Sequence, residues 1–204
     1  MDLGKLYFRF CGYFSEALDF TDDLGKRVLM ARYDYLGGNR LIPLTAEEFL
    51  NLPDPGTICR VAGLVKVDSK SLRASLDVLD ATDARSPKFQ QPSDTELLAG
   101  AEFFGIVGVS GKQSGVYRDT VYRNVTIAFF GNSYKFSLSN DESLFNAFPD
   151  SGLCNISGAV ETTINSIQRD SRTVRFCENS LLLKSVSKYS PSAPETSKRE
   201  RPAA

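Results

Sequence analysis

Apolar and polar residues along this chain alternate in short runs separated by glycine or asparagine, a pattern that predicts β-strands. Residues 27–44, RVLMARYDYLGGNRLIPL, and residues 124–138, NVTIAFFGNSYKFSL, each contain two such runs around a Gly/Asn turn, so each predicts a hairpin. The same alternation predicts further strands at residues 6–14, 57–67, 71–81, 103–111, 153–164 and 172–186.

One phrase of the sequence is written twice. LPDPGTICRVAGLV at residues 52–65 returns as FPDSGLCNISGAV at residues 148–160, with Gly63 in the place of Gly158. The segments upstream of this repeat follow in the same order in both halves. Aligning the two halves places Gly12 on Gly108. The chain is therefore expected to consist of two copies of one β-rich unit.

Each copy predicts five strands with a short helical turn between the third and the fourth, which is the order of the OB-fold, a small Greek-key barrel. The predicted fold class is all-β, with two tandem five-stranded OB-fold barrels; a pair of β-barrels of another topology is the alternative. We expect a first OB-like domain at residues 1–84, an extended linker at 85–100, a second OB-like domain at 101–187 and a disordered tail at 188–204.

Charge gives this protein no overall attraction to nucleic acid or to anionic membrane. Its 204 residues carry 24 Lys and Arg against 25 Asp and Glu, so any anion-binding surface must be local. No apolar run approaches the roughly 20 residues of a membrane span, and the N-terminal residues lack the basic and apolar blocks of a secretory signal. An intracellular, cytoplasmic location without membrane attachment is expected.

The complete absence of histidine argues against many kinds of active site. Without imidazole there is no Ser-His or Cys-His pair and no histidine metal ligand. No Walker or dinucleotide-binding glycine motif is present either, so no enzyme, cofactor or metal site is expected. The four cysteines, Cys11, Cys59, Cys154 and Cys177, form no C-x-x-C pair and are expected to be reduced and packed.

Residues 152–183, GLCNISGAVETTINSIQRDSRTVRFCENSLLL, resemble the closing half of an OB domain of the single-stranded-DNA-binding protein (SSB) family. The first half of the chain is similar through Gly56, Gly63 and Val65. The resemblance implies tandem OB domains that bind single-stranded DNA. The chain departs from the bacterial pattern because it has no tryptophan and ends in SKYSPSAPETSKRERPAA rather than in an acidic, partner-recruiting tip.

Single-strand binding needs exposed aromatic rings on which bases stack. In the strand VLMARYDY, period-two geometry places Tyr33 and Tyr35 on one face. The corresponding segment of the second half offers Phe130 and Tyr134. The alternative is that these rings fill the barrel core, with the tyrosines more apt than a phenylalanine to keep a wet edge.

Single-strand binding also needs cations along the backbone track. The candidates flank the two hairpins and the later loops of each half: Lys26, Arg27, Arg32, Arg40, Lys66, Lys70 and Arg73 in the first half, and Arg118, Arg123, Lys135, Arg169 and Arg172 in the second. The loop SEALDFTDDLGK of the first half is acidic, whereas its counterpart SGKQSGVYRDTVYRN is net basic. The second half is therefore expected to bind more strongly.

Three functional hypotheses follow. The first is sequence-tolerant binding of single-stranded DNA, or RNA, in replication, recombination or repair, for example in a phage or mobile element, with other proteins of those processes as partners. The second is a non-catalytic protein-interaction or assembly module built from duplicated barrels, and the third, disfavoured by the absence of histidine, is an enzyme. Strand addition between barrels could also make a homodimer.

Overall fold

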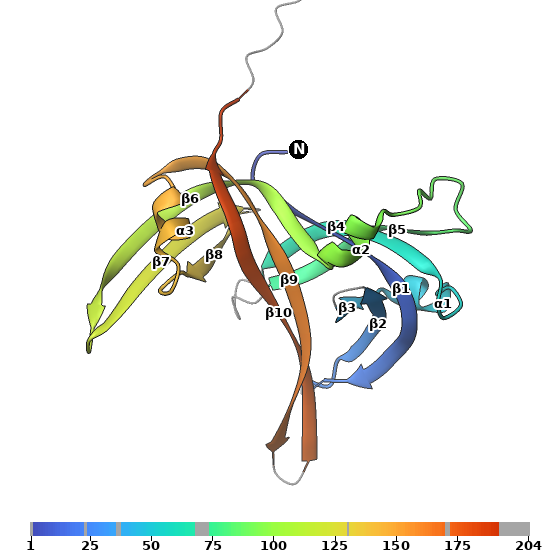
Figure 1. Ribbon diagram of the computed structural model, residues 1–204. Helices are drawn as coiled ribbons and strands as arrows, with labels where there is room; N and C mark the ends of the chain where they lie inside the picture. Colours follow the sequence, from blue (N-terminus) through green and yellow to red (C-terminus); the bar gives the residue numbers. More distant parts are fainter. Residues whose placement is uncertain are drawn as a thin grey trace, which may run out of the picture.

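The computed structural model describes residues 2–22, 24–35, 38–67, 74–129, 131–169 and 172–191. Within them the chain forms ten strands and three short helices (Figure 1). The first half contains β1 (Lys5–Thr21), β2 (Arg27–Tyr35), β3 (Gly38–Pro43), α1 (Ala46–Leu50), β4 (Ile58–Val67) and β5 (Ala74–Asp83). Helix α2 (Asp94–Ala99) precedes the second half, which contains β6 (Glu102–Tyr117), β7 (Thr120–Phe129), β8 (Asn132–Ser137), α3 (Glu142–Ala147), β9 (Gly152–Arg169) and β10 (Arg172–Lys188).

Both halves have the same strand order. Hydrogen-bonded neighbours run β3-β2-β1-β4-β5 in the first half and β8-β7-β6-β9-β10 in the second, and these pairs are antiparallel. A short helix lies between the third and fourth strands of each half, α1 in one and α3 in the other. This is the Greek-key order of the OB-fold, so the predicted fold class of two tandem OB barrels is confirmed.

The repeated phrase supplies the same packing contact in both barrels. Gly63 of β4 pairs with Phe8 of β1, and Gly158 of β9 pairs with Phe103 of β6. A Cβ on either glycine would lie within 2.7 Å of the partner ring, so the phenylalanine occupies the space that a side chain would need. The repeat is therefore a repeat of core packing.

The predicted alignment of Gly12 with Gly108 was wrong by one residue. Tyr13 pairs with Ile58, and Gly108 pairs with Leu153, which holds the same place in its half as Ile58 does in the first. Gly108 thus corresponds to Tyr13 and not to Gly12. A one-residue shift exchanges the faces of a strand, so glycine spacing alone did not determine the register.

The two barrels are joined through their strands. β1 pairs with β6 in antiparallel register from Lys5↔Ile106 to Arg9↔Glu102. At a second point Asn179 of β10 lies opposite Ala74 of β5 and donates a hydrogen bond from Nδ2 to its carbonyl oxygen at 2.9 Å. All ten strands consequently belong to one sheet.

The segment between the halves was expected to be extended, but it ends in helix α2. Ser93 caps this helix by accepting from the backbone N–H of Glu96, whose carboxylate accepts from the Ser93 backbone N–H in return. This capping box satisfies two free donors at the helix start and outweighs the Pro-containing segment before it. The helix packs beside β1, and its Glu96 also pairs with Arg60 of β4.

Two expectations from composition can be compared with the described residues. Cys11, Cys59 and Cys154 are buried free thiols, which confirms the prediction for these three; the Cys177 side chain lies outside the description. None of the helices described is long and apolar enough to cross a membrane.

Candidate nucleic-acid interface

The outer face of strands β6, β7 and β8 carries the candidate interface. OB-folds bind oligonucleotides on the face of their second and third strands and on the loops that follow the first and fourth strands. In the second half these strands are β7 and β8, and the first of these connections is the long β6–β7 hairpin, which extends away from the rest of the molecule at the lower left of Figure 1. We call the end of this hairpin, residues 112–123, the β6–β7 arm.

The aromatic ring of Tyr122 lies on one side of the arm. It lies directly across from Gly115, and a Cβ on that glycine would be 2.6–2.8 Å from the Tyr122 ring atoms. The ring therefore lies over the Gly115 backbone, in space that exists only because position 115 has no side chain. Tyr122 remains 38% exposed, so part of the ring is open to solvent.

Tyr117 extends the same side of the arm to its tip. Tyr117 pairs with Thr120, the neighbour of the Gly115↔Tyr122 pair on that face, and is 65% exposed. The guanidinium carbon of Arg118 lies 5.2 Å from the centre of the Tyr117 ring, within cation–π range. The tip of the arm thus presents two exposed rings, the Arg118 guanidinium and the exposed carboxylate of Asp119.

Lys135 lies on the same face, nearer the barrel. Thr126 of β7 is paired with Lys135 of β8, and Asn124 is paired with Ser137, so these residues share the face of Tyr122. Lys135 is exposed and, among the residues described, has no carboxylate partner. From the tip towards the barrel, this face therefore carries the Tyr117 and Tyr122 rings, then small polar side chains, and then the Lys135 ammonium group.

The corresponding face of the first half is neutralised. Arg32 of β2 lies between two carboxylates, 3.0 Å from Glu16 and 3.7 Å from Asp34. At the base of the β1–β2 turn Arg27 makes two hydrogen bonds to Asp19, at 2.7 and 3.0 Å, and these hold the pKa of that carboxyl below its usual value. A phosphate would have to compete with these carboxylates for either arginine.

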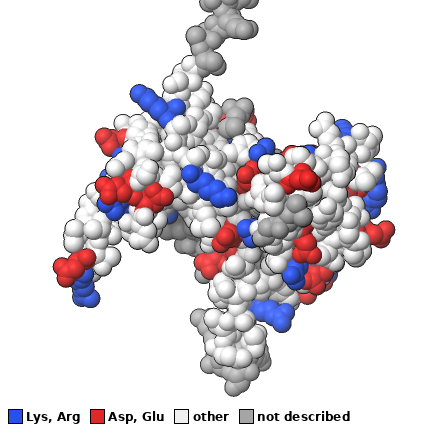
Figure 2. Space-filling model, in the orientation of Figure 1, with Lys and Arg blue, Asp and Glu red and all other residues white. Residues whose placement is uncertain are grey.

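Other predicted cations are also paired. Lys66 lies 2.6 Å from Asp77, and Arg123 lies 2.6 Å from Glu142 on the opposite side of β7 from Tyr122. Arg40 lies 5.2 Å from the ring centre of Tyr35 and 4.0 Å from Glu161 of β9. Figure 2 agrees, because Lys and Arg are interspersed with Asp and Glu over the visible face and form no broad basic surface.

Tyr33 is not available for base stacking, and its prediction as a stacking residue is corrected here. Period two did place Tyr33 and Tyr35 on one face, but that face is the inner one, and both rings contact Phe10. Tyr33 is 3% exposed between Phe10 and Phe14, and burial raises the pKa of its hydroxyl. It is a core residue.

Tyr35 and Tyr134 are half-buried edges of the two cores. The Tyr35 ring lies next to the Cα of Gly100, at the end of α2. Tyr134 packs edge-on against Phe136 with 5.1 Å between ring centres, and burial raises the pKa of its hydroxyl. It lines a hollow of about 460 Å³ between β8 and β10, with Leu144 and Leu181 among its other walls.

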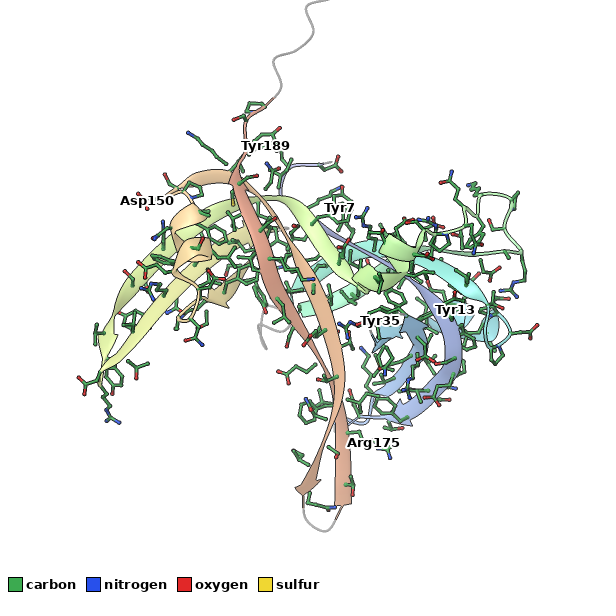
Figure 3. All side chains as sticks on the ribbon, viewed as in Figure 1. Tyr7, Tyr13, Tyr35, Asp150, Arg175 and Tyr189 are labelled. Atoms are coloured by element: carbon green, nitrogen blue, oxygen red, sulfur yellow. The ribbon has the colours of Figure 1, made fainter. Side chains whose placement is uncertain are left out.

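Five of the predicted site residues lie outside the described residues, in whole or in their side chains. Phe130, Lys70 and Arg73 belong to the first group, and Arg169 and Arg172 to the second. Lys26 is exposed after the β1–β2 turn, where its backbone N–H donates to the Asp22 carboxylate. Arg175, not predicted, lies on the β9–β10 hairpin, away from the β6–β8 face (Figure 3).

Tyr117 and Tyr122 were not among the predicted site residues, although Arg118 between them was. Residues 110–124 were expected to form a loop, whereas the chain continues there as two strands joined by two residues. The alternation Val116, Tyr117 and Val121, Tyr122 around Arg-Asp was a usable strand signal.

No protein-family model matches the chain, and no curated protein matches its sequence. Among solved structures it is similar to the wild-type single-stranded DNA binding protein from Thermus aquaticus, with a TM-score of 0.48 and 9% identity over 93% of this chain and 94% of the other. A deletion mutant of that protein gives a TM-score of 0.44 and 8% identity over 94% and 97% of the two chains.

Proposed function

We propose that this protein binds single-stranded DNA on the outer face of β6–β8. The observation that carries the proposal is the combination on one face of two exposed rings, Tyr117 and Tyr122, with two cations, Arg118 and Lys135, that form no ion pair within 4 Å among the described residues. Bases of a single strand can stack on such rings while the cations contact phosphates.

The geometry favours an unpaired strand over a duplex. A ring that lies flat on a strand offers its face, and a base can reach it only when its own face is free of neighbouring bases. Stacking is possible for every base, so the expected binding is sequence-tolerant. Such binding would serve replication, recombination or repair, including that of a phage or mobile element.

Salt dependence distinguishes this mode from general electrostatic attraction. Each phosphate contact on a single strand contributes a slope of about −0.7 to the dependence of log K on log salt concentration. Two free cations, Arg118 and Lys135, therefore predict a slope of about −1.4. A much steeper slope would require a basic surface that Figure 2 does not show on the visible face.

The test is fluorescence anisotropy of a labelled single strand of about 30 nucleotides, titrated with protein at several salt concentrations beside duplex DNA and single-stranded RNA. Tyr122→Ala should weaken single-strand binding by about 5- to 150-fold, because a base stack is worth ~1–3 kcal/mol. Leu24→Ala, an exposed side chain at the β1–β2 turn of the first half, is the matched control and should change affinity by less than about 2-fold.

Absence of single-strand binding at low salt would overturn the proposal and favour the assembly-module hypothesis. Equal weakening by Tyr122→Ala and Leu24→Ala would refute the assignment of the face. Tighter binding of RNA than of DNA would transfer the proposal to RNA, because only RNA carries the 2′-hydroxyl that could add contacts.

A further inference from the structure

The turn at the tip of the β6–β7 arm contains residues that its conformation does not favour. Tyr117 and Thr120 are paired, so Arg118 and Asp119 alone connect the strands, with φ angles of +47° and +63°. Two-residue hairpin turns with positive φ at both positions strongly prefer Asn-Gly, Asp-Gly or Gly-Gly. Asp tolerates this region, but an arginine there is uncommon.

Arg118 and Asp119 are the only non-glycine residues with positive φ in the described part of the chain. At the other positive-φ positions, such as Gly25 beside the β1–β2 turn of the first half and Gly131 before β8, the sequence has glycine. The chain thus uses the favourable residue elsewhere and not at this tip. Backbone strain of this kind concentrates where function requires a particular geometry.

The strained backbone places the guanidinium of Arg118 next to the Tyr117 ring, with 5.2 Å between the guanidinium carbon and the ring centre. A guanidinium is planar and stacks on aromatic rings and on bases, which an ammonium group does not do. Tyr117 is 65% exposed, so the pair is a solvent-facing unit at the end of the arm.

We propose that the Arg118–Tyr117 pair is a base-stacking tip, and that the strained turn is retained because it holds the two groups together. The inference rests on the proposed function and specifies its outermost contact: a nucleobase stacks on this pair beyond the base that stacks on Tyr122. Arg118 contributes through its planar face as well as through its charge.

Three single variants separate strain, charge and planarity. Arg118→Asn installs a residue that accepts positive φ and removes the guanidinium; it should raise the Tm by about 1–3 °C and weaken single-strand binding by about 5-fold or more. Asp119→Gly relieves strain, keeps the guanidinium and removes a carboxylate beside it, so the Tm should rise while single-strand affinity stays constant or increases. Arg118→Lys keeps the charge and the strain, so the Tm should stay constant while affinity falls by about 3-fold or more because the planar group is lost.

Wild-type affinity for Arg118→Lys would overturn the stacking role and leave Arg118 as a charge alone. An unchanged or lower Tm for both Arg118→Asn and Asp119→Gly would overturn the claim of strain. These outcomes are distinct from failure of the proposed function, since that is decided by wild-type binding and by Tyr122→Ala. If those succeed and Arg118→Asn binds as tightly as wild type, only the tip inference fails.

Discussion

Replacing Gly158 by alanine should destabilise the second barrel strongly, because the space for a methyl group is already filled. The new Cβ would lie 2.1 Å from the carbonyl oxygen of Leu182 and 2.6 Å from a ring carbon of Phe103. The oxygen belongs to the backbone of β10, and the ring is fully buried, so neither can turn aside. A carbon and a carbonyl oxygen approach to about 3.3 Å at closest, so β10 would have to move by about 1 Å.

The cost can be estimated from two contributions. Inserting a methyl group into a packed core costs about 1–3 kcal/mol, and each ladder hydrogen bond weakened by the shift of β10 costs about 1 kcal/mol. Gly158→Ala should therefore lower the free energy of unfolding by about 2–4 kcal/mol. For a chain of this length 1 kcal/mol corresponds to about 2–4 °C, so the Tm should fall by roughly 5–15 °C.

Gly108→Ala is the matched control on a neighbouring strand. Its Cβ would meet nothing closer than the carbonyl oxygen of Ala128 at 3.9 Å, an ordinary contact. Alanine also reduces the entropy of the unfolded chain, so this variant should be neutral or more stable by up to about 1 kcal/mol. Urea and thermal denaturation followed by circular dichroism would measure both. A difference of less than about 0.5 kcal/mol between the variants would refute the packing account.

Two further predictions concern titratable groups. Arg85 binds the Asp83 carboxylate and lowers the pKa of that carboxyl in the folded state, so the associated stability is present above about pH 4 and is lost as the pH falls through the lower folded pKa. The urea midpoint of Asp83→Asn should accordingly depend less on pH in this acid range than that of wild type; equal slopes would contradict it. Burial raises the pKa of Cys59 to about 12 and of Cys154 to about 11, so in a Cys177→Ser protein the remaining thiols should react with a thiol reagent only on unfolding. Rapid labelling of the native protein would show that these thiols are accessible.

The local sequence pattern predicted the fold because each copy of the repeat contains the glycine that the core packing of its barrel requires. Gly63 and Gly158 stand where a phenylalanine of the first strand needs room, and the residues around them return in the same order. Helix α2 was missed because its signal, Ser93 followed by Glu96, is short and lies directly after a Pro-containing segment.

The side of the barrel on which an aromatic ring lies could not be predicted from alternation. In β2 both faces carry apolar residues, since Met30 and Ala31 are both buried, so period two separates two faces without saying which one is inside. Tyr33 was therefore indistinguishable from an exposed ring until its contacts with Phe10 and Phe14 were known.

Ion pairs are also hidden from the sequence, because they depend on register. Lys66 lies directly opposite Ser75 but pairs with Asp77, whose strand partner is Leu64. The register between β4 and β5 shifts at Ala62 and Gly63, and no sequence motif marks that shift. Asp19, one of the carboxylates of the acidic first hairpin loop, does form such an ion pair, with Arg27.

The pairing of β1 with β6 gives the first barrel a supporting role in the proposed binding mode, although Arg32 on its own outer face is paired with carboxylates. β6 is paired with β1 over residues 102–106, and the same strand continues to Tyr117 at the tip of the arm. The part of β6 that leads into the arm is therefore held by two neighbours before any ligand is present, β1 over residues 102–106 and β9 over residues 102–109. In the proposed binding mode, less conformational entropy is lost when a strand engages an arm that is already held than when the arm must be ordered on binding. Duplication can thus strengthen binding by one barrel through support, without a second binding face.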